Sequence, residues 1–204
     1  MKIQLEKPDI NSLPESPGLY TFHLKIADLA ILGLRGNADF TNGEINNAKL
    51  KLLKRINRLK KIYEVKNYKG KLSVGDGDRV SEKYKLEAKT EISLKFEFLK
   101  NRLEFIDDIS NLVKILNSLN FLMPPLYVGI TVNQGLKTRY WQHKRNYEKN
   151  ESGTFGSRLK SDGLLWSDLE FHTVIIPSSI MEKSTVQFCE SLIHAFGRPI
   201  YSYS

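Results

Sequence analysis

The stretch Pro125–His143, PLYVGITVNQGLKTRYWQH, constrains the fold more than any other part of this 204-residue chain. The aliphatic residues of its first part alternate with Tyr127 and Gly129, and this period of two predicts a β-strand. Thr131–Gln134 matches a capping box, which would begin a helix. We therefore expect a strand, a short turn and a helix in succession, with Tyr127 on the strand face that carries no bulky aliphatic side chain.

The helix expected after this turn carries Arg139 and His143 one turn apart, so that both side chains share one helix face. An amphipathic helix with a solvated arginine would show the same spacing. A second strand is expected at Gly18–Leu24, where Tyr20 would face the same way as Tyr127 if the two strands pair. A tyrosine packed in the core is the alternative interpretation of Tyr20.

Towards the C-terminus a third strand is expected at about 170–176, and a capping box at 179–182 opens a last helix that runs to about Phe196. Val186, Cys189 and Ile193 form the apolar stripe of that helix, and Glu190 lies directly beside it. Carboxylates are seldom buried without a partner, so a cation, an arginine or a metal ion is expected near Glu190. A half-exposed glutamate with a packed aliphatic stem is the alternative.

The ordered set Gly18-Leu-Tyr20, Tyr127-Val-Gly129, Arg139 with His143, and Glu190 on a late helix resembles the GIY-YIG nuclease superfamily. The resemblance covers roughly residues 12–24 and 124–202. It implies an α+β fold with a small three-stranded antiparallel sheet flanked by helices, formed by residues 1–24 and 124–204. Residues 25–123 would then be a large, mostly helical, basic subdomain inserted between the first two motif strands.

The same resemblance implies a metal-dependent DNA endonuclease. Glu190 would be the only protein ligand of Mg²⁺ or Mn²⁺, and Arg139 would clamp the scissile phosphate. Tyr127 would orient or activate the attacking water with support from Tyr20, and His143 would relay a proton or contact the phosphate. One such site cuts one strand, so double-strand cleavage requires a homodimer or two successive visits.

This chain departs from the family pattern in three ways. Ser202 occupies the place of the family's asparagine, about a hundred residues separate the two tyrosine strands, and no recognisable zinc finger or helix-turn-helix follows the core. These departures leave open a catalytically silent nucleic-acid-binding module, and also a nuclease subunit that needs a partner protein. The sequence does not decide between DNA and RNA.

The excess of 31 Lys and Arg over 23 Asp and Glu gives a net charge of +8, which favours a polyanionic partner such as DNA. The basic side chains gather at 49–61, on the polar faces of a helix expected over 46–63, where no acidic residue interrupts them. A solvated helix face is the alternative. The side chains expected to contact DNA are Lys54, Arg55, Arg58 and Lys61 on this helix, and Lys144 and Arg145 after the central motif.

Elsewhere the insertion shows a second helical pattern from Leu99 to Asn120, and between the two helices a hairpin or meander around Gly75–Asp78. The apolar run 26–34 fits either a hairpin strand or a short helix. Residues 145–161 are polar and without a clear period, which predicts a flexible loop near the substrate.

A single cysteine, Cys189, excludes an internal disulfide, and Cys/His spacing typical of structural zinc is absent from the sequence. No apolar run approaches the length of a membrane span, and the charged start of the sequence does not resemble a signal peptide. We therefore expect a cytoplasmic protein. His23, His172 and His194 have no motif support and are expected to be structural.

Overall fold

The computed structural model describes residues 9–35, 39–73, 80–89, 96–176, 182–197 and 199–201. Over these ranges the chain has an α+β fold with seven α-helices, a three-stranded antiparallel sheet and a separate two-stranded sheet. It divides into two compact units, Met1–Ile26 with Lys114–Ser204, and Ala27–Val113. This boundary crosses helix α4 (Ile109–Leu119), which the predicted division at 25–123 places whole in the insertion. None of the helices in the described part is long and apolar enough to cross a bilayer.

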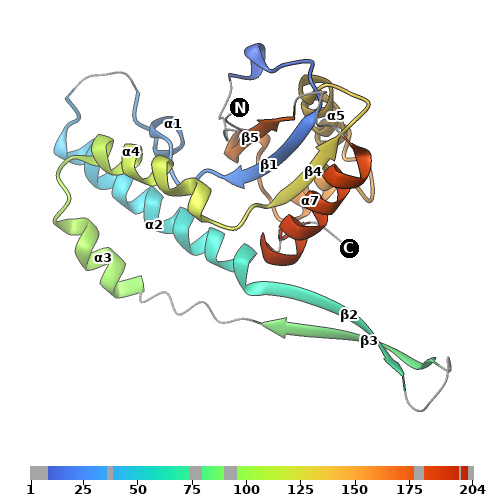
Figure 1. The fold of residues 1–204 in the computed structure, drawn as a ribbon. Coiled ribbons are helices and arrows are strands. Elements are labelled where there is room, and N and C mark those ends of the chain that lie inside the picture. Colours follow the sequence, from blue (N-terminus) through green and yellow to red (C-terminus); the bar gives the residue numbers. More distant parts are fainter. Residues whose placement is uncertain are drawn as a thin grey trace. The chain divides into compact units, whose positions relative to one another are not determined.

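The three-stranded sheet confirms the predicted strands to within one residue at each end. Strand β1 (Gly18–Leu24) lies in the middle, between β4 (Tyr127–Thr131) and β5 (Leu169–Ile175), and pairs antiparallel with both (Figure 1). Tyr20 is opposite Gly129, and Phe22 is opposite Tyr127. Because directly opposed residues share a sheet face, Tyr20 and Tyr127 lie on the same face, as predicted.

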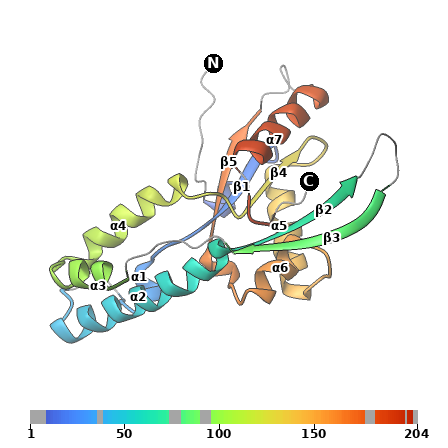
Figure 2. The ribbon, with the colours of Figure 1, turned by 90° about the horizontal axis from the view of Figure 1, so that it is seen from below.

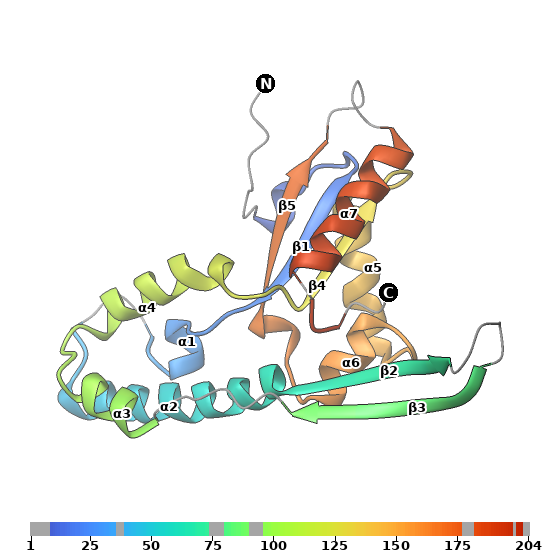
Figure 3. The ribbon, with the colours of Figure 1, turned by 60° about the horizontal axis from the view of Figure 1, so that its bottom comes forward.

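The two faces of the sheet are covered by different helices. Helices α5 (Leu136–Lys149) and α6 (Phe155–Ser161) pack on the tyrosine face, and the aromatic side chains there form the centre of the core. Helix α7 (Lys183–Gly197) packs against β4 from the other face (Figures 2 and 3). Among the side chains described on this helix Val186 is buried, and Cys189 and Ile193 are half-buried on the same side, which confirms that part of the predicted stripe.

The start of α5 differs from the expected capping box. Thr131 still belongs to β4, and its hydroxyl donates to the carbonyl of Gln134 over 2.6 Å, so that it closes the turn instead of capping a helix. Helix α5 begins only at Leu136. Its first two amides donate to the backbone carbonyls of Ser16 and Pro14, at 2.9 and 3.2 Å. The segment before β1 therefore satisfies donors that a side-chain cap would otherwise serve.

The loop predicted over 145–161 is wrong, because most of this segment is helical. Helix α5 continues to Lys149 and ends at Asn150, which adopts the left-handed conformation. Helix α6 then begins after Thr154, whose hydroxyl accepts from the amide of Ser157. Phe155 is buried in the aromatic core, so a short, polar-looking helix is held by tertiary packing. The capping box expected at 179–182 falls mainly on residues outside the described ranges.

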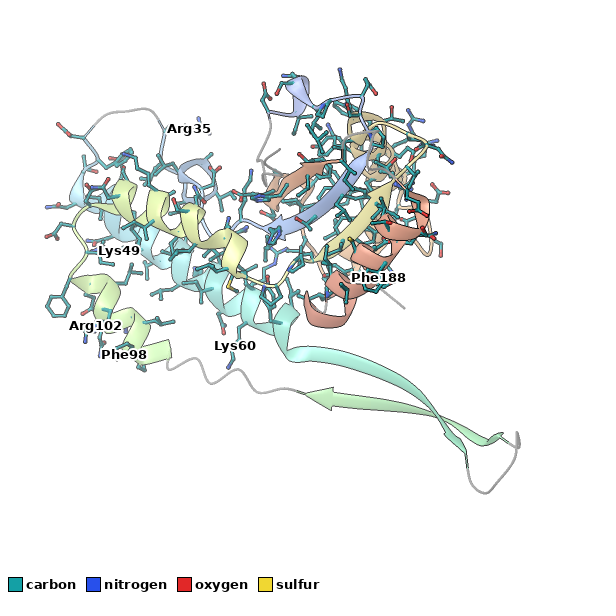
Figure 4. The ribbon with its side chains drawn as sticks, viewed as in Figure 1. Arg35, Lys49, Lys60, Phe98, Arg102 and Phe188 are labelled. Atoms are coloured by element: carbon teal, nitrogen blue, oxygen red, sulfur yellow. The ribbon has the colours of Figure 1, made fainter. Side chains whose placement is uncertain are left out.

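The second unit contains α1 (Leu29–Leu32), α2 (Asn42–Glu64), β2 (Val65–Ser73), β3 (Val80–Lys89), α3 (Phe96–Glu104) and the first part of α4. The apolar run 26–34, which fitted either a strand or a short helix, contains the short helix α1. Strands β2 and β3 pair antiparallel, as predicted for a hairpin, and its turn lies outside the described residues. Lys49 on α2 donates to the carbonyl of Glu104 over 3.1 Å, and the guanidinium group of Arg102 lies 5.1 Å from the centre of the Phe98 ring on the same helix, α3. Figure 4 labels Lys49, Phe98 and Arg102.

The single helix predicted from Leu99 to Asn120 is wrong in one respect, because α3 and α4 are separated at 105–108. The carboxylate of Asp108 accepts from the amide of Asn111 over 2.9 Å, as an N-terminal cap does. The apolar spacing continues across this break, so periodicity alone does not reveal it.

Candidate active site

The hydroxyl of Tyr20 joins two elements of the first unit, β1 and α5. It lies 2.8 Å from Nε2 of His143 and accepts from Nε of Arg139 over 3.1 Å, so β1 and one face of α5 are held together at a single oxygen. Arg139 also donates from Nη1 to the side-chain oxygen of Gln142 over 2.9 Å. Tyr20 is 1% exposed and His143 is 6% exposed, which makes this a buried polar cluster at the edge of the aromatic core.

The direction of one of these bonds follows from the chemistry of the groups. Arginine has no acceptor, so the Tyr20 oxygen accepts from Arg139. The tautomer of His143 decides which of Tyr20 and His143 donates in the bond between them. Burial, followed by the positive charges of Arg139 and Arg158, lowers the pKa of His143 to about 3, so the ring is neutral at physiological pH.

The two tyrosines have different environments. Burial raises the pKa of Tyr20, the neighbouring Tyr127 raises it further, and Arg139 acts in the opposite direction. Tyr20 is therefore a fixed, protonated phenol. Tyr127 is only half-buried, with its ring 6.2 Å from that of Tyr20 and 5.2 Å from that of His143. Of the two phenols, Tyr127 is the one that solvent or a substrate can approach.

Gly129 is required here by the packing of Tyr20. A β-carbon at position 129 would overlap the hydroxyl of Tyr20 and would lie 3.0 Å from the ring of Tyr127. The glycine opposite Tyr20 thus allows the phenol to lie flat across the sheet, with its oxygen at Arg139 and His143. The absence of a β-carbon at Gly129 therefore leaves the space that the phenol of Tyr20 occupies.

Glu190 lies apart from this cluster in the described structure. Its side chain is 28% exposed on α7, and its carboxylate is 3.8 Å from Nε2 of His194, one turn further along the helix. Among the described residues it makes no hydrogen bond or ion pair with Tyr20, Tyr127, Arg139 or His143. The described part of the chain contains no group of three His, Cys, Asp or Glu side chains placed to hold a metal ion.

The side chains on α2 that were expected to contact DNA differ in their exposure to solvent. Lys54 and Arg58 are exposed, as a phosphate contact requires. Arg55 is only 9% exposed, so it does not belong to the exposed basic surface to which it was assigned. The side chain of Lys61 lies outside the described residues, as does Ser202.

The expected contacts after the central motif belong to α5. Arg145 is exposed. Lys144 is half-buried, with its ammonium 4.8 Å from the centre of the Trp141 ring and 3.9 Å from the carboxylate of Glu148. The cation at 144 is therefore engaged with its own helix.

Sequence reasoning missed Gln142 and Arg158. Gln142 is three residues after Arg139, a spacing that places the two side chains side by side on a helix, so this signal was available. Arg158, which acts on the pKa of His143, lies in the segment expected to be a loop.

A second polar group, also missed, lies on the opposite sheet face. His23 bonds to Thr21 at 3.0 Å, His172 is 3.4 Å from Glu170, and the two imidazole rings are 5.0 Å apart. All of these but Thr21 are buried.

Comparison of the chain with protein-family models, with curated proteins and with solved structures found no match.

Proposed function

We propose that this protein is a metal-dependent endonuclease that hydrolyses phosphodiester bonds in DNA, with a core of the GIY-YIG kind. The observation that carries the proposal is the convergence of Tyr20, Arg139 and His143 at one oxygen, beside Tyr127, on one face of a three-stranded antiparallel sheet. Tyr20 is more than a hundred positions from Arg139 and His143 in the chain, so it is the fold that brings these three side chains together.

The roles follow from the environments of the side chains. Arg139 is held in place by Tyr20 and Gln142, and a preoriented guanidinium suits a phosphate whose negative charge grows in the transition state. Tyr127 orients the attacking water, because it is the accessible phenol. Tyr20 and His143 are positioning residues, since the proton of one is bound by the other.

The metal ion would be held by Glu190. Its half-exposed carboxylate has the oxygen donors that Mg²⁺ and Mn²⁺ prefer, and a single protein ligand leaves the remaining positions for water and phosphate. When bound, the ion would neutralise charge at the scissile phosphate and at the leaving oxygen. His194 is the neighbour with which the ion would compete for this carboxylate.

The test is cleavage of supercoiled plasmid in Mg²⁺ or Mn²⁺ by the wild type and by Glu190→Gln. Glu182→Gln is the matched control, because Glu182 is an exposed carboxylate at the start of the same helix. Loss of nicking in Glu190→Gln alone supports the proposal. Equal nicking by all three proteins, or none that depends on metal, overturns it.

A nucleic-acid-binding module without nuclease activity is the second candidate. The observation that favours it is the separation of Glu190 from the tyrosine cluster, because its carboxylate lies 3.8 Å from His194 on its own helix. This candidate requires binding to DNA or RNA that weakens with salt, without cleavage of any duplex, branched or single-stranded substrate in either metal.

A further inference from the structure

A shallow groove of about 370 Å³ runs along α5 next to the tyrosine cluster, and its lining combines an aromatic ring with cations and polar groups. We call it the Trp141 groove; it is lined by Glu15, Lys137, Thr138, Trp141, Gln142 and Arg145. We propose that it binds an unpaired nucleobase stacked on Trp141. This inference deepens the proposed function and rests on it, because it specifies the form of nucleic acid that the same site takes.

Trp141 is the first observation. The residue is 41% exposed, whereas the other tryptophan, Trp166, packs against Phe22 and donates its indole N–H to Tyr140 over 2.8 Å. Tyr140 lies edge-on to Trp141 at 5.5 Å, which supports the ring from its own helix. An exposed, supported indole is a typical stacking platform for bases, and stacking of this kind tolerates any base.

The charge around Trp141 selects the ligand. Lys137 and Arg145 line the groove together with Glu15, whose carboxylate accepts from the hydroxyl of Thr138 over 3.3 Å. Cations beside an exposed aromatic ring are the combination that binds a nucleic-acid strand, since the cations attract phosphates while the ring takes a base. A purely apolar partner would leave Lys137 and Arg145 desolvated at a cost.

Gln142 connects the groove to the candidate active site. It lines the groove, and its side-chain oxygen accepts from Nη1 of Arg139. Trp141 and Arg139 are two residues apart and do not share a helix face, so Gln142 is the side chain through which the groove adjoins Arg139. A base within a continuous duplex has both faces covered by its neighbours. The groove therefore fits a base in a single-stranded segment, a flap or a bulge, or one that is turned out of the helix.

The experiment uses the full-length Trp166→Phe protein, in which Trp141 is the sole tryptophan, titrated without divalent metal by an oligothymidylate and by a blunt duplex of equal length. Quenching of Trp141 fluorescence by the single strand, and much less by the duplex, is expected. If Trp166→Phe does not fold, the difference in quenching between the wild type and Trp141→Phe gives the same information. Absence of quenching by the single strand overturns the proposal.

Affinity provides the second measurement. Trp141→Ala should weaken binding of the single strand by roughly 5- to 150-fold, the range for loss of one base–aromatic stack, while Trp141→Phe should retain most of it. The control is Leu165→Ala, which removes another exposed apolar side chain of the first unit, outside the groove. Equal weakening of single-strand and duplex binding by Trp141→Ala, or no weakening, contradicts the stacking site.

These outcomes are separate from those of the cleavage test. Quenching and selective loss in Trp141→Ala without any metal-dependent cleavage would refute the endonuclease and keep the stacking site. Cleavage of duplex at a normal rate by Trp141→Ala, together with unchanged single-strand affinity, would keep the endonuclease and refute the stacking site.

Discussion

The hydroxyl oxygen of Tyr20 lies 2.8 Å from Nε2 of His143, although the two residues are 123 positions apart in the chain. The same oxygen accepts from Arg139, so both hydrogen-bond partners of this buried hydroxyl come from α5. These bonds hold the ring of His143 and the guanidinium group of Arg139 in place. Tyr20 therefore supports Arg139 from the central strand of the sheet.

Replacing Tyr20 by phenylalanine removes this support while keeping the ring. His143 and Arg139 each lose a buried partner, so the free energy of unfolding should fall by about 1–3 kcal/mol. On the proposed function, cleavage should also slow by roughly tenfold or more, since Arg139 is no longer held. Chemical denaturation and plasmid nicking measure the two effects.

The matched control for this change is Tyr147→Phe. Tyr147 is on α5 as well, but its hydroxyl donates to the backbone carbonyl of Leu164 over 3.1 Å. It should lose a comparable amount of stability and keep its cleavage rate. If both variants cleave equally, the hydroxyl of Tyr20 has only a structural role.

Gly129→Ala should be strongly destabilising, because the new methyl group would overlap the Tyr20 hydroxyl. Overpacking of this kind costs about 1–3 kcal/mol, and relief of it would move the phenol away from Arg139. Gly43→Ala provides the contrast. Gly43 is on α2, where its added methyl meets nothing closer than 4.0 Å, so alanine should stabilise that helix by about 0.5–1 kcal/mol. Thermal unfolding of both variants checks the prediction, and a Tm for Gly129→Ala equal to that of the wild type would contradict it.

Much of the fold was predictable from local pattern. The three strands follow from alternation around Tyr20, Tyr127 and residues 170–176, and their common register places both tyrosines on one face. The errors arose where tertiary structure replaces a local signal. Helix α5 is capped by carbonyls of the preceding segment instead of by Thr131, and α6 is short and polar in sequence but is held by buried Phe155.

Only part of the candidate site was predictable from the sequence. Arg139 and His143 are four residues apart, which was enough to place them on one face of a helix, whereas their meeting with Tyr20 was implied only by the resemblance. The position of Glu190 relative to them was not predictable, because it depends on which sheet face α7 covers and not on periodicity within α7. The effect of Arg158 on the pKa of His143 was not predictable either, because it depends on how α6 packs.

Stability should decrease below about pH 6.5. Burial, and then the electrostatic effect of the neighbouring His172, lowers the pKa of His23 to about 4, with Glu170 acting in the opposite direction. Burial, followed by the charges of Arg139 and Arg158, likewise lowers the pKa of His143, to about 3. Both rings are neutral when folded and take up a proton near pH 6.5 when unfolded. The unfolded state therefore binds more protons between about pH 6.5 and 4, so stability is complete above that window and declines as the pH falls through it.

The depression at His23 corresponds to roughly 3 kcal/mol lost by pH 4. Denaturation at pH 7.5 and at pH 5 measures this dependence, and His23→Asn should make it shallower than in the wild type. An unfolding free energy that stays constant over this interval would show that the two rings are not held neutral.

Arg139→Lys separates the geometry of Arg139 from its charge. Arginine donates at once to Tyr20 and to Gln142, and a lysine with a single nitrogen on a flexible stem cannot reproduce this fork. Charge is unchanged, so the salt dependence of DNA binding should remain as in the wild type, whereas cleavage should fall by roughly 10- to 100-fold. Arg145→Lys makes the same exchange at an exposed position of the same helix and should keep its rate within about twofold. A wild-type rate for Arg139→Lys would mean that positive charge alone is sufficient, and the network around Tyr20 would then act on stability alone.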